Sequence, residues 1–254
     1  AKNRFGVLPV TKDEHAMAVE KVRHAGDLVA CVAAIDEATA REAERLIQVE
    51  YELIDPIHDM REGLEDSEEP IHDRGDYHIG ESNVQKRVFQ EFGDVEGMKE
   101  NSVASHKKNW IFAGVNHAFT EPHAVVAHWE PNGRLTLYTP QQVPHYVHRA
   151  LADVLEIPMH QINVHRTFVG GGFGGKSDPF PHEMCAAILA RKSGKPVRIT
   201  FDREEVYWVN RGRHPSRIEM NLHADDEGRI CGIETDALIC LLYTSDAADD
   251  LRCV

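Results

Sequence analysis

Five glycines within six residues, Gly170 to Gly175, constrain this chain more than any other feature. Glycine has no Cβ, so such a run indicates backbone that passes close to another group or takes left-handed conformations. Apolar and polar residues alternate from residue 161 to 169, which predicts a strand before the run. Helical spacing from residue 181 to 192, ended by Gly194, predicts a helix after it. The sequence therefore predicts a strand, a binding loop and a helix in that order.

The glycine run formally fits two nucleotide-binding motifs. Residues 170–177 match the phosphate-loop pattern GxxxxGKS, and residues 170–175 match the dinucleotide pattern GxGxxG. However, Pro179 and Pro181 stand where a phosphate loop needs free helical N–H groups. The dinucleotide pattern also lacks an acidic residue at the end of a strand about 20 residues further on. Because of these mismatches, a phosphate-loop-like nucleotide-binding protein is kept only as an alternative function for this chain. A non-catalytic binding module is the other alternative.

Four segments together resemble one enzyme family. Residues 170–176 (GGGFGGK) resemble the cofactor loop of the xanthine dehydrogenase and aldehyde oxidase family of molybdenum hydroxylases. Residues 139–145 (TPQQVPH) resemble the threonine–glutamine motif that precedes a helix in that family. Residues 201–205 (FDREE) and 210–215 (NRGRHP) resemble two segments that follow the loop. The order and spacing also match, and the resemblance covers about residues 4–239, part of a molybdopterin-binding large subunit.

The resemblance implies four cofactor-binding residues. Gln142 matches the glutamine whose side-chain amide donates a hydrogen bond to an oxo ligand of molybdenum. Gly172, Phe173 and Gly174 match the loop whose backbone lies against the metal and its pterin. The implied cofactor is the molybdenum pyranopterin, as molybdopterin itself or in its cytosine dinucleotide form. Read without the resemblance, Gln142 would be a turn residue and Phe173 a core residue.

No catalytic residue and no protein ligand to a metal is assigned within the chain. The family's general base is a glutamate near the end of the large subunit, which we expect beyond the end of this sequence. We therefore expect a fragment, truncated at both ends and inactive alone, of a molybdenum-dependent oxidoreductase.

Two features of the sequence bear on the substrate: one departs from the family pattern and the other resembles one of its branches. Purine-oxidising members carry a glutamate directly after the lysine of GGGFGGK, and Ser177 stands there instead, which argues against xanthine. Residues 142–148 resemble the 4-hydroxybenzoyl-CoA reductases, which favours a small aromatic or CoA-thioester substrate. The alternative is an oxidising member that acts on an aldehyde or an N-heterocycle. His145 and His148 follow Gln142 closely and are candidates for the pocket wall.

Composition limits the partners. The chain has 28 basic and 42 acidic residues, and the net charge of −14 disfavours nucleic acid and anionic membranes. No apolar run has transmembrane length and no signal peptide is recognisable, so a cytoplasmic location is expected. The five cysteines form no CxxC pair, so no zinc or iron–sulfur site is expected within this chain. The resemblance implies a small [2Fe-2S] partner subunit and, in many members, a flavin subunit.

The predicted architecture is mixed α+β. Residues 1–55 are expected to be the C-terminal part of an α/β hammerhead-type domain, with a buried strand in residues 25–35, a helix from 36 to 49 and a strand at 51–54. Residues 56–84 are polar and predict a connector.

Residues 85–239 are expected to form the first part of the molybdopterin cofactor-binding domain. A short helix capped near Asp94 is followed by strands at 105–112, 120–129 and 134–138 and by a strand pair within 218–237. Residues 241–250 resemble translated sequencing-adapter DNA, so residues 240–254 are interpreted as a non-native tail.

Overall fold

The computed structural model describes residues 3–7, 12–65, 70–72, 83–84 and 87–240. Within these ranges the elements are, in chain order, β1 (Arg4–Phe5), β2 (Glu14–His15), α1 (Glu37–Arg45), the 3₁₀ helix η1 (Glu62–Leu64), α2 (Val95–Asn101), β3 (Ala104–Phe112), β4 (Ala124–Trp129), β5 (Leu135–Thr139), α3 (Pro144–Leu155), the 3₁₀ helix η2 (Met159–Gln161), β6 (Ile162–Arg166), α4 (Pro181–Ser193), β7 (Val197–Thr200), α5 (Arg203–Val209), β8 (Ser216–Ala224) and β9 (Ile230–Ile239).

A four-stranded sheet and two helices form the main core. The strand order is β6-β5-β4-β7, in which β5 and β6 are parallel and the other pairs antiparallel. α3 packs on β6, α4 packs on β4 and β7, and the two helices contact each other. Leu135 and Leu137 of β5, Leu151 of α3 and Met184 of α4 are fully buried there. Burial of such side chains stabilises the fold by about 1.5–3 kcal/mol each.

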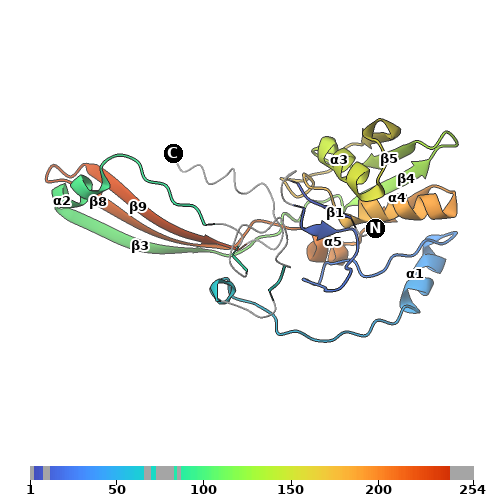
Figure 1. The fold of residues 1–254 in the computed structure, drawn as a ribbon, viewed down its shortest axis with the longest axis horizontal. Helices are drawn as coiled ribbons and strands as arrows, with labels where there is room; N and C mark the ends of the chain where they lie inside the picture. The colour runs from blue at the N-terminus through green and yellow to red at the C-terminus, as the bar shows by residue number, and fades with distance from the viewer. Residues whose placement is uncertain (1–2, 8–11, 66–69, 73–82, 85–86, 241–254) are drawn as a thin grey trace.

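A second sheet extends away from this core as an arm (Figure 1). It consists of β3, β8 and β9 in antiparallel order, with β8 in the centre. Every residue of β3 is exposed. α2 packs near the far end of the arm, where Asp94 caps the helix by accepting a hydrogen bond from Gly97 N–H at 2.9 Å. The sheet is therefore held by its backbone ladder more than by a core of its own.

The first residues of the chain pack onto the core of the four-stranded sheet. β1 and β2 form a short antiparallel pair, and β1 contacts α3. Phe5 and Ala16 are fully buried among the core residues. α1 begins at Asp36, whose carboxylate accepts from Thr39 N–H at 2.8 Å, as expected of an N-cap residue.

Most elements predicted from the sequence are confirmed, and two are wrong. Residues 28–35 and 51–54 form no strand, and Ile35 and Leu53 are 96% and 91% exposed. A strand needs a neighbouring strand to satisfy its backbone, and none of the described strands lies alongside these segments. The strand predicted from residue 120 begins only at Ala124, because Pro122 has no N–H to give to a ladder.

Two further predictions fall partly outside the described residues, the connector for about half of its length and the tail for all but its first residue. In the predicted connector, η1 is the one regular element of the described part. Of the predicted tail, only Cys240 is described, and its N–H donates to the carbonyl of Pro215 at 3.1 Å. Among the described residues, no helix has both the length and the apolar character needed to cross a membrane.

Candidate functional site

The β5–α3–β6 unit brings two loops to one edge of the four-stranded sheet. β5 and β6 are parallel, and Thr167 N–H extends their pairing by donating to the carbonyl of Thr139 at 3.1 Å. Gln142 follows β5, and residues 170–176, the glycine loop, follow β6. Parallel strands present their carboxyl ends at the same edge, so the two loops lie next to each other. This edge is the usual ligand position in an α/β sheet.

The glycine loop contains three residues in left-handed conformations. The φ angle is +93° at Gly171, +53° at Phe173 and +95° at Gly174. A hydrogen bond from Gly175 N–H to the carbonyl of Gly172, at 2.7 Å, closes a tight turn around Phe173. Phe173 is 71% exposed, so its interpretation as a core residue is wrong. A left-handed conformation at a non-glycine residue costs about 1–2 kcal/mol, which the surrounding contacts must offset.

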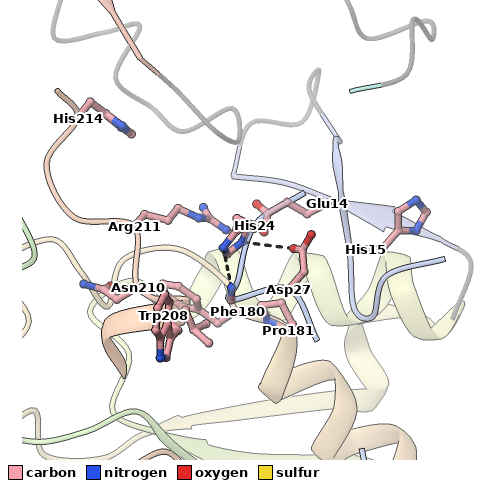
Figure 2. Close-up of a pocket in the computed structure, with 12 residues that line it drawn as sticks. Glu14, His15, His24, Asp27, Phe180, Pro181, Trp208, Asn210, Arg211 and His214 are labelled. Carbon is pink, nitrogen blue, oxygen red and sulfur yellow. Dashed lines mark hydrogen bonds and ion pairs between the residues drawn. The ribbon is translucent and has the colours of Figure 1, made fainter. Parts of the chain in front are cut away.

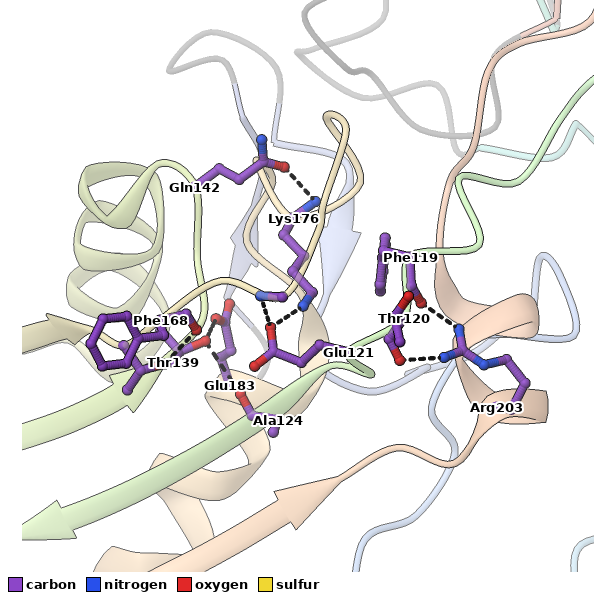
Figure 3. A network of polar contacts seen from close by, with 12 residues as sticks. Phe119, Thr120, Glu121, Ala124, Thr139, Gln142, Phe168, Lys176, Glu183 and Arg203 are labelled. Carbon is purple, nitrogen blue, oxygen red and sulfur yellow. Dashed lines mark hydrogen bonds and ion pairs between the residues drawn. The ribbon is translucent and has the colours of Figure 1, made fainter.

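Gln142 is bound to the glycine loop through its carbonyl oxygen. Oε1 accepts from Gly174 N–H at 3.1 Å. It also accepts from Lys176 N–H at 3.2 Å (Figure 3). Gln142 N–H in turn donates to the carbonyl of Lys176 at 2.8 Å. Because Oε1 is directed at the loop, the Nε2 donor points away from it, as Figure 3 shows. Gln142 therefore offers a fixed N–H donor beside the loop.

The side chain of Lys176, the last residue of the glycine loop, is buried beneath the loop and does not reach its surface. Its side chain is 1% exposed, and Nζ contacts Glu121 Oε2 at 2.7 Å. The same ammonium lies 4.7 Å from the centre of the Phe119 ring. In a phosphate loop this lysine would reach the phosphates. Here the ammonium is committed to Glu121, which disfavours the phosphate-loop interpretation.

Uncharged groups line the other side of the loop. A Cβ on Gly175 would lie 2.8 Å from His117 Nδ1 and 3.0 Å from Asn210 Oδ1. The Asn210 amide lies 3.2 Å from His117 Nδ1. Burial, together with the charge of Arg213, lowers the pKa of His117 below its usual value of 6.5. Glycine at position 175 is therefore required by close packing.

Glu183 fixes the start of α4 beneath the site. Its carboxylate accepts from Phe180 N–H at 3.0 Å, from Thr139 Oγ1 at 2.8 Å and from Gln141 Nε2 at 3.1 Å. Burial raises the pKa of Glu183 from 4.5 to about 7, although these hydrogen bonds act in the opposite direction. The group thus ties the residues just before Gln142 to the helix that follows the glycine loop.

Glu183→Gln is expected to reduce the loss of stability between pH 4.5 and 7. In the folded state Glu183 keeps its proton up to about pH 7, whereas in the unfolded chain it loses the proton near pH 4.5. The free energy of unfolding therefore falls as the pH rises across this interval. The fall is about 3 kcal/mol, since one pKa unit corresponds to about 1.4 kcal/mol. Urea unfolding at several pH values measures it. The exposed Glu100→Gln is the control, and an unchanged pH dependence in Glu183→Gln would contradict the assignment.

Arg211 joins the base of the loop to the start of the chain. Nη1 contacts Asp178 Oδ2 and Nη2 contacts Glu14 Oε2, each at 2.5 Å. Figure 2 shows Arg211 beside Glu14. Burial raises the pKa of Glu14 to about 8 against the opposing effect of Arg211. A cavity of about 200 Å³ lies beside this cluster, with Trp208 and Phe180 in its wall.

The structure brings the four predicted cofactor residues together, and among the described residues it shows no hydrogen bond between them and the two candidate histidines. Gln142 and the glycine loop are in contact. His148 instead lies against the carbonyl of Met159 at 2.8 Å, and His145 is exposed at the start of α3. Within the described residues, no group of three or more His, Cys, Asp or Glu side chains could hold a metal ion.

Sequence reasoning missed the roles of Glu121, Lys176 and Arg211 in supporting the loop. Their contacts join residues far apart in the chain, which no local pattern reveals. One sequence signal does bear on the site: a strand, a helix and a strand between residues 134 and 169 are typical of a βαβ unit with parallel strands. That pattern alone would have placed Gln142 next to the glycine loop.

Two protein-family models match the chain. The molybdopterin cofactor-binding domain matches residues 78–251, more than half of the chain. The α/β hammerhead domain of aldehyde oxidase and xanthine dehydrogenase matches residues 1–55.

Known proteins resemble the chain over most of its length. It is 32% identical to the nicotinate dehydrogenase large molybdopterin subunit of Eubacterium barkeri over 92% of this chain and 53% of that protein. It is 31% identical to the xanthine dehydrogenase molybdenum-binding subunit of Escherichia coli O157:H7 over 89% of this chain and 29% of that subunit. Quinoline 2-oxidoreductase from Pseudomonas putida 86 superimposes with a TM-score of 0.79 and 30% identity, over 88% of this chain and 28% of that one.

The predicted mixed α+β architecture, with the end of a hammerhead domain before a cofactor-binding domain, is therefore confirmed. The chain spans about half the length of the first of these relatives and under a third of the other two. With the glycine loop, Gln142 and the matched domain models in agreement, the chain belongs to the molybdopterin cofactor-binding domain family of the xanthine dehydrogenases and aldehyde oxidases.

Proposed function

We propose that this chain is part of the molybdopterin-binding subunit of a molybdenum-dependent oxidoreductase, and that Gln142, Gly172, Phe173 and Gly174 form its share of the cofactor site. One observation carries the proposal. The glycine loop binds Gln142 Oε1, so that the Nε2 donor points away from the loop at the edge where parallel strands present ligands.

The donors at this edge fit an oxygen-rich, anionic group. Gln142 Nε2 would donate to an oxo ligand of the metal. Phe173 N–H is used by no hydrogen bond within the described part of the chain and belongs to an exposed residue, so it would supply a second donor. The absence of a Cβ at Gly172 leaves room for Gln142. The bound molybdenum pterin, as molybdopterin or its cytosine dinucleotide form, would supply two-electron redox chemistry.

The proposal includes a division of the chain and its partners. Residues 1–55 would end a hammerhead-type domain, 56–84 would connect it to the cofactor domain at 85–239, and 240–254 would be a non-native tail, although the family match extends to residue 251. Electrons would pass through a [2Fe-2S] subunit, with a flavin subunit as a further partner, in the cytoplasm. The family resemblance supports these partners.

Two substrate classes remain as candidates. The similar relatives are named for nicotinate, xanthine and quinoline, which supports oxidation of an aromatic N-heterocycle. The sequence of residues 142–148 supports a 4-hydroxybenzoyl-CoA reductase-like enzyme that acts on an aromatic CoA thioester. Ser177 in place of the glutamate of purine-oxidising members argues against xanthine in either case. Turnover of nicotinate, quinoline and 4-hydroxybenzoyl-CoA by the complete enzyme would separate the two classes.

Gln142→Ala is expected to lower turnover by about 100-fold in the complete enzyme, the usual effect of removing a fixed donor that stabilises charge in a transition state. Molybdenum and pterin content, measured beside turnover, distinguishes lost binding from lost catalysis. Gln90→Ala, an exposed glutamine outside the site, is the control. A complete wild-type subunit that contains no molybdenum or pterin would overturn the proposed function.

A further inference from the structure

A single ion pair supports both ends of the glycine loop. Lys176 stands at the end of the loop, and its buried ammonium contacts Glu121 Oε2 at 2.7 Å. The same carboxylate oxygen accepts from the N–H of Gly170, the first residue of the loop, at 2.7 Å (Figure 3). Glu121 N–H also donates to the carbonyl of Gly170 at 3.1 Å. One carboxylate oxygen therefore closes the loop at its base.

The contacts at the base of the loop also involve Gln142. The backbone of Lys176 bonds Gln142 in both directions, with N–H to Oε1 at 3.2 Å and carbonyl to N–H at 2.8 Å. A shift of Lys176 would thus move the residue that holds the side-chain amide of Gln142. No other side chain of the described residues links Glu121 to Gln142 in this way.

We propose that Lys176 and Glu121 are positioning residues that fix the shape of the glycine loop and, through it, the direction of the Gln142 amide. This inference rests on the proposed function, because Gln142 and Phe173 matter only if a cofactor meets them. Neither residue of the pair needs to contact the cofactor. The role differs from that of a phosphate-loop lysine, whose ammonium contacts the ligand itself.

The physical case depends on the flexibility of glycine and on the strength of charged hydrogen bonds. A loop with five glycines populates many conformations unless tertiary contacts select one. Hydrogen bonds to charged groups are among the strongest available. At 1% exposure, the Lys176 ammonium has little water to replace Glu121, so the pair strongly favours the closed arrangement. The ring of Phe119 supports the same position of the ammonium from its other side.

The first test measures hydrogen exchange of individual backbone amides in this 254-residue chain. Lys176→Met removes the ammonium at similar length, and Glu121→Gln weakens the pair while keeping an acceptor. Exchange of the amides of Gly170, Gly174 and Lys176 is expected to rise about tenfold or more, the factor expected when a hydrogen bond to a charged group is lost. Amides of β5 and α4 should change little.

The control is Lys99→Met, which removes an exposed ion pair to Glu234 on the arm, 2.9 Å long. It should leave the loop amides unchanged. If Lys176→Met does not fold, Glu121→Gln still decides the question. Wild-type exchange of the loop amides in a folded variant would overturn the inference, and so would a uniform rise across the whole sheet, since that indicates general destabilisation.

The second test uses the complete enzyme. Lys176→Met is expected to keep bound pterin but to lower kcat about tenfold or more with a smaller effect on KM, because the amide of Gln142 is misdirected. Wild-type kcat in this variant would overturn the positioning role. If the wild-type enzyme itself contains no pterin, the proposed function fails, whereas the exchange experiment still shows whether the ion pair orders the loop.

Discussion

Arg211→Met is expected to lower the free energy of unfolding above pH 8, where Glu14 is charged, by about 3–5 kcal/mol, the range observed when one partner of a buried ion pair is removed. The substitution keeps an apolar stem but leaves Glu14 and Asp178 without their shared cation. Glu14 is 3% exposed, so water cannot replace the guanidinium. Urea or thermal unfolding of the 254-residue chain measures the effect.

The pH dependence of this loss tests its cause. Arg211 lowers the pKa of Glu14, so its removal raises the folded-state pKa further above the unfolded value of 4.5. The free energy of unfolding of the variant then keeps falling above pH 8, where Glu14 of the wild type is already charged, so the loss in Arg211→Met should grow as the pH rises above about 8. Arg213→Met, two residues away and exposed, is the matched control. Equal losses in both variants would show that the buried cluster is not the source.

Gly172→Ala is expected to lower turnover of the complete enzyme by about 100-fold, the effect that a displacement of about 1 Å can have on a positioned group. An added Cβ would lie 2.5 Å from Gln142 Oε1 and 2.8 Å from its Cδ. The side chain can swing aside at modest cost in stability, but it must then release Gly174 and Lys176. The expected result is therefore a stable protein with a misdirected amide.

Gly63→Ala is the control for this substitution, because its added Cβ would meet nothing closer than Asn83 Cβ at 4.0 Å. Turnover, pterin content and the melting temperature should be measured on both variants. Wild-type turnover in Gly172→Ala would mean that the contact between the loop and Gln142 does not matter for catalysis.

The sequence predicted the local parts of the site well. The glycine run, the strand before it and the helix from Pro181 all depend on neighbouring residues, and all are confirmed. The strands predicted at residues 28–35 and 51–54 failed for the opposite reason. Their apolar residues satisfy a local pattern, but a strand is completed by a partner that the pattern does not describe.

The supporting contacts could not be predicted in the same way. Glu121 reads as one acidic residue among 42 Asp and Glu, and nothing in its neighbours assigns it to Lys176. In the sequence, Arg211 stands out only as part of a family motif, whereas its partners lie in β2 and just after the glycine loop. Charge pairing of this kind becomes visible only when the sheet order is known.

The separation of the loop's partners along the chain has a consequence for how the site forms during folding. Glu121 is 49 residues from Gly170 and 55 residues from Lys176, the two ends of the loop that it contacts. Gln142 is 32 residues from Gly174, to which it is hydrogen-bonded. Contacts of such separation form only after the intervening chain has been ordered, because loop closure costs entropy that local structure does not repay. The glycine loop therefore cannot take this shape before these distant contacts form, and a short peptide with its sequence would not hold this conformation.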